Sequence, residues 1–296
     1  MKTTRILAFA GLFLFMAANS FPQPVSVPRS SSRQTIEQDL GLGKVTLSYS
    51  RPNVHGRTVF GELVPYGAVW RMGANSATSI KFTDEVTVEG NKVPAGEYGL
   101  FAIPGPDEWV IILNKTSRQW GAYSYKQEDD LVRFKVKPLQ ESASTETMTF
   151  WFGNVDKTTC ELEMRWEKSG FRLHISTDVD AKVMADIDKV MNNDNKPYFT
   201  AAQYYYENGK DLNKALEWIS VAEKSDPKST GYKLWKARIL LKMGRKAEAL
   251  ATAQEGVKLA AAENNKEYVY VVSRECLAER LAPMQAAPIA QMGLFS

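Results

Sequence analysis

The sequence is poor in the residues that metal sites and disulfide frameworks require. It contains two cysteines, Cys160 and Cys276, and two histidines, His55 and His174. So few potential ligands exclude a structural zinc site, and we predict neither a metal nor any other cofactor. The two cysteines fall in different predicted domains, so we expect each of them to be a buried free thiol.

An excess of charge of one sign is also missing. The 296 residues carry a formal net charge of +3, and neither half contains the basic stripe that binding to a phosphate backbone requires. We therefore expect no nucleic-acid partner. The length favours two domains, and the hydrophobic content of 44% is ordinary for a soluble globular protein.

Long hydrophobic runs are absent except near the N-terminus. There two basic residues precede an apolar run over 6–16, and Ala18 and Ser20 supply the small side chains that a signal peptidase needs. The run is too short to span a bilayer as a permanent helix. We predict a signal peptide over 1–20, a flexible leader over 21–35, no membrane span after cleavage, and a periplasmic or secreted location.

Short strands and turns dominate residues 36–178. Apolar residues alternate with polar ones in several runs, which is typical of strands with one buried face. One pair of runs, 160–166 and 171–175, is separated by a turn signal at 168–170 and predicts a hairpin. The pattern predicts an antiparallel β-sandwich-like domain.

The hydrophobic period becomes helical after Asp178, and an internal repeat follows. Ala215 and Ala249 are 34 residues apart, which is the period of the tetratricopeptide repeat. Small residues at these positions let paired helices cross closely. The sequence therefore predicts a tetratricopeptide-like helical domain over 182–281, and the whole chain is expected to be of the α+β class.

Two repeats are fewer than a stable array usually needs. We expect helices over 182–191 and 266–281 to close the ends of the array, with the β-rich domain covering further surface. The segment 282–296 contains two prolines and is predicted to be a disordered tail.

The densest candidate site lies in the irregular stretch 51–80, where three arginines accompany a single acid, Glu62. Arginine forks suit carboxylate or phosphate groups, and glycines let backbone approach a ligand. One interpretation is a pocket for a small polar or anionic ligand. The alternative is that the arginines bind loop carbonyls and Glu62 and hold a long connection together. The candidate ligand-binding residues are Arg51, His55, Arg57, Trp70, Arg71 and Asn75.

An enzyme is an alternative, most simply a hydrolase with His55 as general base and the arginines stabilising an anion. A general base needs a nucleophile beside it, and Ser48, Ser50 and Asp84 show no diagnostic spacing. We therefore assign no catalytic residue. A solvent-exposed position is the expectation for His174, which faces away from its apolar neighbours in a predicted strand.

The first predicted domain contains a series of short motifs. They are Ser50-Arg51-Pro52, Gly56-Arg57, Phe60-Gly61, Leu63-Val64-Pro65-Tyr66-Gly67, Trp70-Arg71-x-Gly73-Ala74-Asn75-x-Ala77-Thr78, Val86-Thr87-Val88 and Pro94-Ala95-Gly96-Glu97-Tyr98 followed by Ile103-Pro104. These motifs resemble the DUF2911 family, exported bacterial proteins that share a domain of unknown function. The resemblance covers about residues 36–176 and implies a β-rich fold and export, but no activity. The tetratricopeptide-like tail is similar to an extension in some members of that family.

Together these patterns favour an extracytoplasmic binding or scaffolding protein. Helical repeats form surfaces that engage protein segments, so we expect a protein partner there, and the first domain is the candidate for a small ligand. The hydrolase and a purely structural envelope protein are the alternatives. The discriminating feature is whether His55 and the arginines converge on one cleft.

Overall fold

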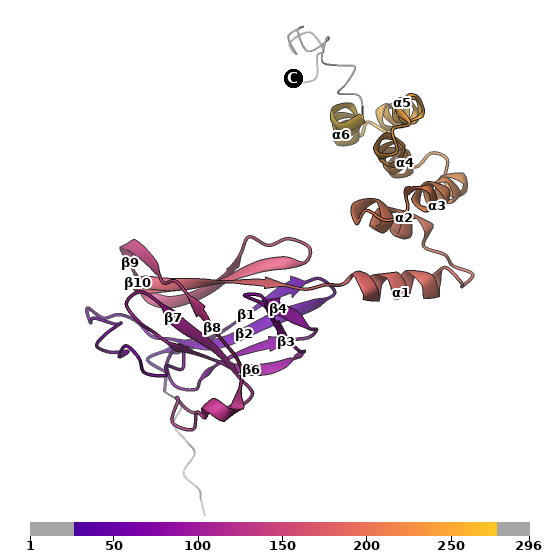
Figure 1. Cartoon of the computed structure of the whole chain (residues 1–296). Helices are drawn as coiled ribbons and strands as arrows, with labels where there is room; N and C mark the ends of the chain where they lie inside the picture. The colour runs from indigo at the N-terminus through magenta and orange to yellow at the C-terminus, as the bar shows by residue number, and fades with distance from the viewer. Residues whose placement is uncertain (1–26, 277–296) are drawn as a thin grey trace, which may run out of the picture. The chain divides into compact units, whose positions relative to one another are not determined.

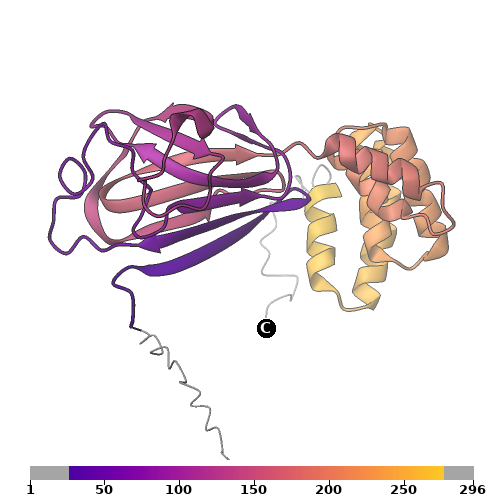
Figure 2. The same cartoon turned by 90° about the horizontal axis from the view of Figure 1, so that it is seen from below.

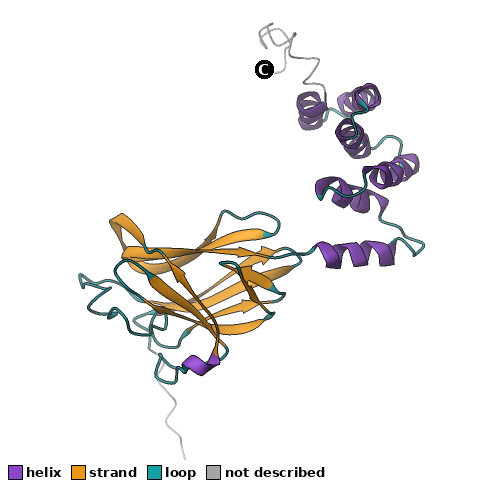
Figure 3. Cartoon of the chain, viewed as in Figure 1, coloured by secondary structure: helices purple, strands orange, loops and turns teal. Residues whose placement is uncertain are grey.

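The computed structural model describes residues 27–276. The chain forms two compact units, Met1–Asp178 and Val179–Ser296. Figure 3 shows that the first unit is built of strands and the second of helices, so the predicted α+β class is confirmed. Within the described range, no helix is both long and apolar enough to span a bilayer. The predicted signal peptide (1–20) and tail (282–296) lie outside the described residues.

From residue 27 onward, the first unit contains two antiparallel sheets (Figure 1). The first sheet has six strands in the order β1-β2-β3-β6-β7-β8, and the second has four in the order β5-β4-β10-β9. A short 3₁₀ helix, η1 (Gln127–Asp129), precedes β8. The strands are β1 (Ser32–Leu40), β2 (Gly43–Arg51), β3 (Thr78–Phe82), β4 (Val86–Val88), β5 (Asn91–Val93), β6 (Gly96–Ile103), β7 (Trp109–Asn114), β8 (Asp130–Val136), β9 (Leu139–Gly153) and β10 (Thr159–Ser176).

The two sheets enclose one hydrophobic core. Tyr49 of β2 meets Phe150 of β9 edge to face, with ring centroids 4.8 Å apart. The Tyr49 hydroxyl also accepts a hydrogen bond from the Phe150 backbone N–H at 2.9 Å and donates one to Gln34 Oε1 at 2.6 Å. Because this buried hydroxyl has both a donor and an acceptor, it joins the sheets without an unpaired polar group.

Strand β1 begins at Ser32, inside the segment 21–35 that the sequence predicts to be a flexible leader. It pairs with β2 along its whole length, from Ser32 opposite Arg51 to Leu40 opposite Gly43. An edge strand with an exposed face tolerates polar residues, because the backbone pairing does not depend on apolar side chains. The leader prediction is therefore too long by the residues that enter β1.

The predicted hairpin with a turn at 168–170 is wrong, because β10 runs unbroken through that segment. The pairing with β9 shifts register on both sides of Glu167, which has a positive φ of 55°. Between Arg165 and Ser169 of β10 the pairing partner changes from Thr149 to Gln140, so the extra residues lie on β9, and β10 continues without reversing. The buried apolar positions of β10 are even-numbered up to Trp166 and odd-numbered from Phe171, so the face that points into the core changes across this segment.

Six helices form the second unit as far as residue 276, and Figure 2 shows consecutive helices of the repeats side by side. Gly209 and Gly244 follow α2 and α4 with φ of 65° and 78°, the left-handed conformation that ends helices. Ala215 and Ala249 are 0% and 1% exposed, as close helix crossings require. The helices are α1 (Asp180–Val190), α2 (Tyr198–Glu207), α3 (Leu212–Ser225), α4 (Thr230–Lys242), α5 (Lys246–Ala262) and α6 (Lys266–Cys276).

Further helices pack at both ends of the two repeats. Ile187 of α1 is buried in one cluster with Ala201 of α2 and Ile219 of α3. At the other end, Tyr268 of α6 packs on a cluster that contains Leu234 of α4. These contacts bury apolar faces that two repeats alone would leave in water.

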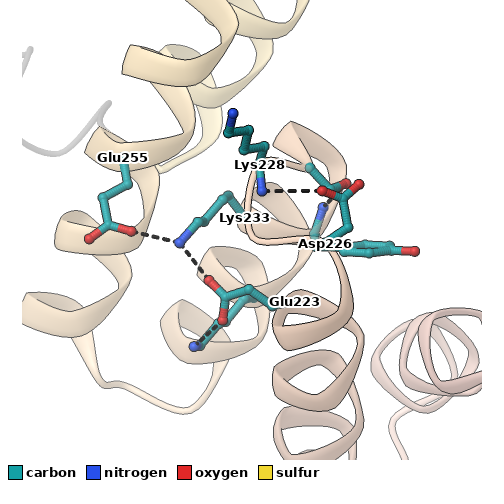
Figure 4. A network of polar contacts seen from close by, with 8 residues as sticks. Glu223, Asp226, Lys228, Lys233 and Glu255 are labelled. Carbon is teal, nitrogen blue, oxygen red and sulfur yellow. Dashed lines mark hydrogen bonds and ion pairs between the residues drawn. The ribbon is translucent and has the colours of Figure 1, made fainter.

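A charged network ties three consecutive helices together (Figure 4). The Lys233 ammonium of α4 lies 2.7 Å from Glu223 of α3 and 2.7 Å from Glu255 of α5. Lys236 forms a second ion pair with Glu223. The side chains of Glu223 and Lys233 are only 14% and 12% exposed, so solvent screens their attraction less than that of a surface pair.

Candidate functional site

The irregular connection between β2 and β3 forms one wall of a pocket of about 320 Å³. Two isolated β-bridges, Asn53 to Thr147 and Trp70 to Ala102, hold this connection against the sheets. Four of the six predicted site residues line the pocket, namely His55, Arg57, Trp70 and Arg71. The other lining residues are Ser30, Ser31, Pro52, Asn53, Leu63, Val64, Gly73, Ala74 and Trp166. Arg51 and Asn75 are not among the lining residues.

Backbone with positive φ is concentrated at this pocket. His55, Met72 and Asn75 have backbone φ angles of 49°, 50° and 60°, which residues other than glycine adopt only uncommonly. Gly73 has φ of 150°, and a Cβ there would lie 2.7 Å from the Ser50 carbonyl oxygen. Only glycine fits at that position. Such strain is typical of functional segments that the surrounding fold holds in place.

Two of the three arginines are occupied by backbone carbonyls. Arg51 donates from Nε to the Met148 carbonyl at 3.0 Å and from Nη2 to Thr149 Oγ1 at 2.7 Å. Arg57 donates to the carbonyls of Val54 at 2.9 Å and Asn53 at 2.6 Å. Arg57 thus binds carbonyls of its own loop, as the alternative interpretation predicts, whereas the partners of Arg51 lie on β9.

Arg71 is different, because its guanidinium has no hydrogen-bond or ion-pair partner among the described residues, and its Nε is buried. The indole Nε1 of Trp166, a residue 2% exposed, is likewise buried without a partner. Both residues line the same pocket, and both unpaired groups are donors. A buried donor without an acceptor costs about 1–3 kcal/mol, so this pocket favours a ligand that supplies acceptor oxygens.

The remaining candidates frame the pocket. Trp70 is 6% exposed and stacks on Trp166, with ring centroids 5.8 Å apart and planes inclined by 19°. Asn75 donates from Nδ2 to the Ser31 carbonyl at 3.4 Å, which fastens the start of β1 beside the pocket. These contacts place an aromatic pair and a fixed backbone segment around the two unpaired donors.

His55 has little around it that would make it a general base. Its side chain is 69% exposed, and Nδ1 lies 4.0 Å from Glu146 Oε1. The same carboxylate accepts a hydrogen bond from the His55 backbone N–H at 3.0 Å. None of Ser48, Ser50 and Asp84, the nucleophile candidates from the sequence, lines the pocket.

Cys160 is buried and free, as the sequence predicts. Burial, with a smaller contribution from the neighbouring Glu161 carboxylate, raises the pKa of its thiol to about 11. A thiol with so high a pKa is almost entirely protonated at neutral pH and is a poor nucleophile.

Sequence reasoning missed two parts of the pocket. The sequence indicates that Trp166 is a core residue, because it continues a run in which every second residue is apolar. Its side chain is indeed buried. Nothing in the sequence indicates that its N–H lacks an acceptor. Ser31 falls in the predicted leader, and only the pairing of β1 brings it to the pocket.

The fold and the pocket define a two-domain protein, in which an antiparallel β-domain precedes a tetratricopeptide-like helical domain. Residues 31–175 match the family model described as "Protein of unknown function (DUF2911)". The β-domain therefore matches the DUF2911 family model, as its motifs predict.

Residues 182–256 match a second family model, "Anaphase-promoting complex, cyclosome, subunit 3". This match agrees with the tetratricopeptide-like repeats that the structure shows. No curated protein matches the chain, and no solved structure does so either.

Proposed function

We propose that this is an extracytoplasmic binding protein whose β-domain holds a small anionic ligand and whose helical repeats engage a protein partner. The observation that carries the ligand is the pair of unpaired buried donors, on Arg71 and Trp166, in one pocket. A carboxylate or phosphate supplies several acceptor oxygens, and the Arg71 guanidinium supplies the charge. The signal peptide that the sequence predicts over 1–20 supports an extracytoplasmic location.

Partly exposed aromatic and cationic side chains on the helical domain support the proposal of a protein partner. On α4, the Arg238 guanidinium lies 4.7 Å from the centroid of the Trp235 ring. Lys242 lies 4.5 Å from the centroid of the Tyr206 ring of α2, and the Tyr206 and Trp235 rings meet edge to face at 5.6 Å. Aromatic and arginine side chains are enriched where proteins bind one another.

A thermal-shift screen of small carboxylates and phosphorylated compounds tests the ligand. We expect at least one compound to raise the melting temperature of the wild type, since a ligand that binds only the folded state stabilises it. The shift should vanish in Arg71→Met. Arg172→Met is the matched control, because Arg172 pairs with Glu161 and Glu163 and does not line the pocket. No shift with any compound, or an equal shift in both variants, would contradict the proposal.

A further inference from the structure

A second hollow, of about 510 Å³, lies on the first sheet and shares no lining residue with the pocket of Arg71. Ser79 of β3 contributes to its floor from the face opposite the core, since the neighbouring Ile80 is 1% exposed and buried between the sheets. Ser76, Glu97, Arg33 and Arg118 also line it, and Trp120 stands beside them. We refer to this hollow as the Trp120 groove.

The indole of Trp120 is 63% exposed, although its backbone is firmly held. Trp120 forms a bridge with Ser76, and the residues on either side are hydrogen-bonded as well. The Ala77 N–H donates to the Gln119 carbonyl at 2.9 Å, and the Gly121 N–H donates to the Asn75 carbonyl at 3.0 Å. The exposed ring is therefore presented on a fixed backbone.

A small apolar cluster anchors the same loop to the sheet. Phe101 of β6 and Ile112 of β7 are 0% exposed and pack with Ala122 and Tyr125 of the loop. The loop thus packs Ala122 and Tyr125 on the sheet and leaves Trp120 and Tyr123 outside. Unlike Tyr123, Trp120 lines the hollow, and an exposed indole on a fixed backbone there offers a flat apolar face on which a ligand ring can stack.

The polar groups of the Trp120 groove include both donors and acceptors. Among the described residues, the Arg33 side chain has no hydrogen-bond or ion-pair partner, and Gln119 Oε1 is a buried acceptor without one. Arg118 lies 3.7 Å from Glu97, so the groove carries charges of both signs. An anion would meet the Glu97 carboxylate, and an apolar ligand would leave these groups unpaired.

A pyranose ring matches this arrangement. One face of the ring is lined with C–H groups that pack on an indole, and its hydroxyls both donate and accept hydrogen bonds. We propose that the Trp120 groove binds a pyranose residue of a carbohydrate, with Trp120 stacking on the ring and Gln119, Arg33 and the serines contacting its hydroxyls. This site is independent of the proposed anion pocket.

Native affinity electrophoresis of the full chain tests the proposal. Gels contain a soluble β-glucan, a galactomannan or glycol chitin, and binding is then measured by calorimetry with the corresponding oligosaccharides. The three polymers separate glucose, mannose and amino-sugar sources of the same ring chemistry. We expect at least one polymer to retard the wild type, and Trp120→Ala to weaken binding about tenfold or more.

Tyr123→Ala is the matched control, because Tyr123 is 86% exposed in the same loop and does not line the groove. It should bind like the wild type, as should Arg71→Met, while Arg33→Ala should bind more weakly. Thermal melts confirm that each variant is folded. The proposal is overturned if no polymer retards the wild type, if Trp120→Ala binds equally well, or if Tyr123→Ala loses binding to the same extent.

Discussion

The Arg51 guanidinium donates from Nε to the Met148 carbonyl at 3.0 Å, across 97 positions of sequence. This hydrogen bond joins the end of β2 in the first sheet to β9 in the second. Arg71 has no such partner among the described residues. Two arginines of one irregular stretch therefore have different roles, and the difference has measurable consequences.

Arg51→Met should lower the free energy of unfolding of the β-domain by about 1–3 kcal/mol, because it leaves partly buried acceptors without their donor. Arg71→Met removes no such bond and also removes an unpaired buried donor, so it should not lower the free energy of unfolding. Urea unfolding of the two variants beside the wild type measures both effects. An equal loss in both would mean that Arg71 is also structural.

Trp166→Phe keeps an aromatic ring and removes the unpaired N–H. It should weaken binding of the ligand found by the thermal-shift screen about tenfold, since one hydrogen bond is lost. Trp109→Phe is the control, because Trp109 lies in the same aromatic cluster but does not line the pocket. Calorimetric titration should show weaker binding in Trp166→Phe only. Weakening of the same size in Trp109→Phe would point to a general loosening of the core.

Gly73→Ala should destabilise the β-domain more than Gly56→Ala. Both glycines have positive φ, but a Cβ on Gly73 would lie 2.7 Å from the Ser50 carbonyl, whereas a Cβ on Gly56 meets nothing within 4 Å. Strain alone costs of order 1–3 kcal/mol, and the clash adds to it only at Gly73. Thermal melts rank the two variants, and the reverse order would be inconsistent with the backbone described at the pocket.

Ala249→Trp should lower the free energy of unfolding of the helical domain by about 1–3 kcal/mol, because it overpacks a close helix crossing. Ala249 is 1% exposed, whereas Ala251 on the same helix is exposed, so Ala251→Trp is the matched control. Circular dichroism at the helical band follows the melts. If the two variants melt alike, the crossing is not tightly packed.

The charged network predicts a pH dependence for the helical domain. Burial by itself would raise the pKa of Glu223, but hydrogen bonds from Lys233 and Lys236 hold it below its ordinary value of 4.5. A carboxyl group with a lowered folded-state pKa contributes stability above its unfolded-state pKa, and that contribution is lost as the pH falls through the folded-state value. The network should therefore stabilise fully at neutral pH and progressively less below pH 4.5.

Glu223→Gln should reduce stability at neutral pH and flatten the fall at acidic pH. Glu248→Gln is its control. Glu248 is also in an ion pair, with Arg245, but its side chain is 57% exposed, and exposed ion pairs contribute little to stability. Urea unfolding of the helical signal at neutral and acidic pH measures both slopes. If stability falls as steeply at acidic pH in Glu223→Gln as in the wild type, other carboxylates are responsible for that fall.

The sequence predicts the elements of this fold better than their connections. Alternation along β2 identifies Val45, Leu47 and Tyr49 as buried, because the pattern depends only on the local period of a strand. The bulge at Glu167 is not predictable in this way, since a turn signal and a bulge use the same residue types. Whether the chain reverses there is decided by pairing with β9.

The candidate site shows the same limit. Composition identifies the stretch that carries His55, Arg57 and Arg71, and these three residues do line one pocket. Composition cannot separate Arg71 from Arg51, because the partner of Arg51 is a carbonyl that is distant in sequence. Which donors remain unpaired is a property of the assembled sheets.

The two repeats have a consequence for how such a chain changes length over evolution. Helix α6 packs against α5 and α4 in the position that the first helix of a third repeat would occupy. A copy of α4 and α5 inserted between α5 and α6 would meet a related surface on each side. In-frame duplication of this segment is thus a change that the helical half of the molecule can absorb, and each added copy would lengthen the face available to a partner.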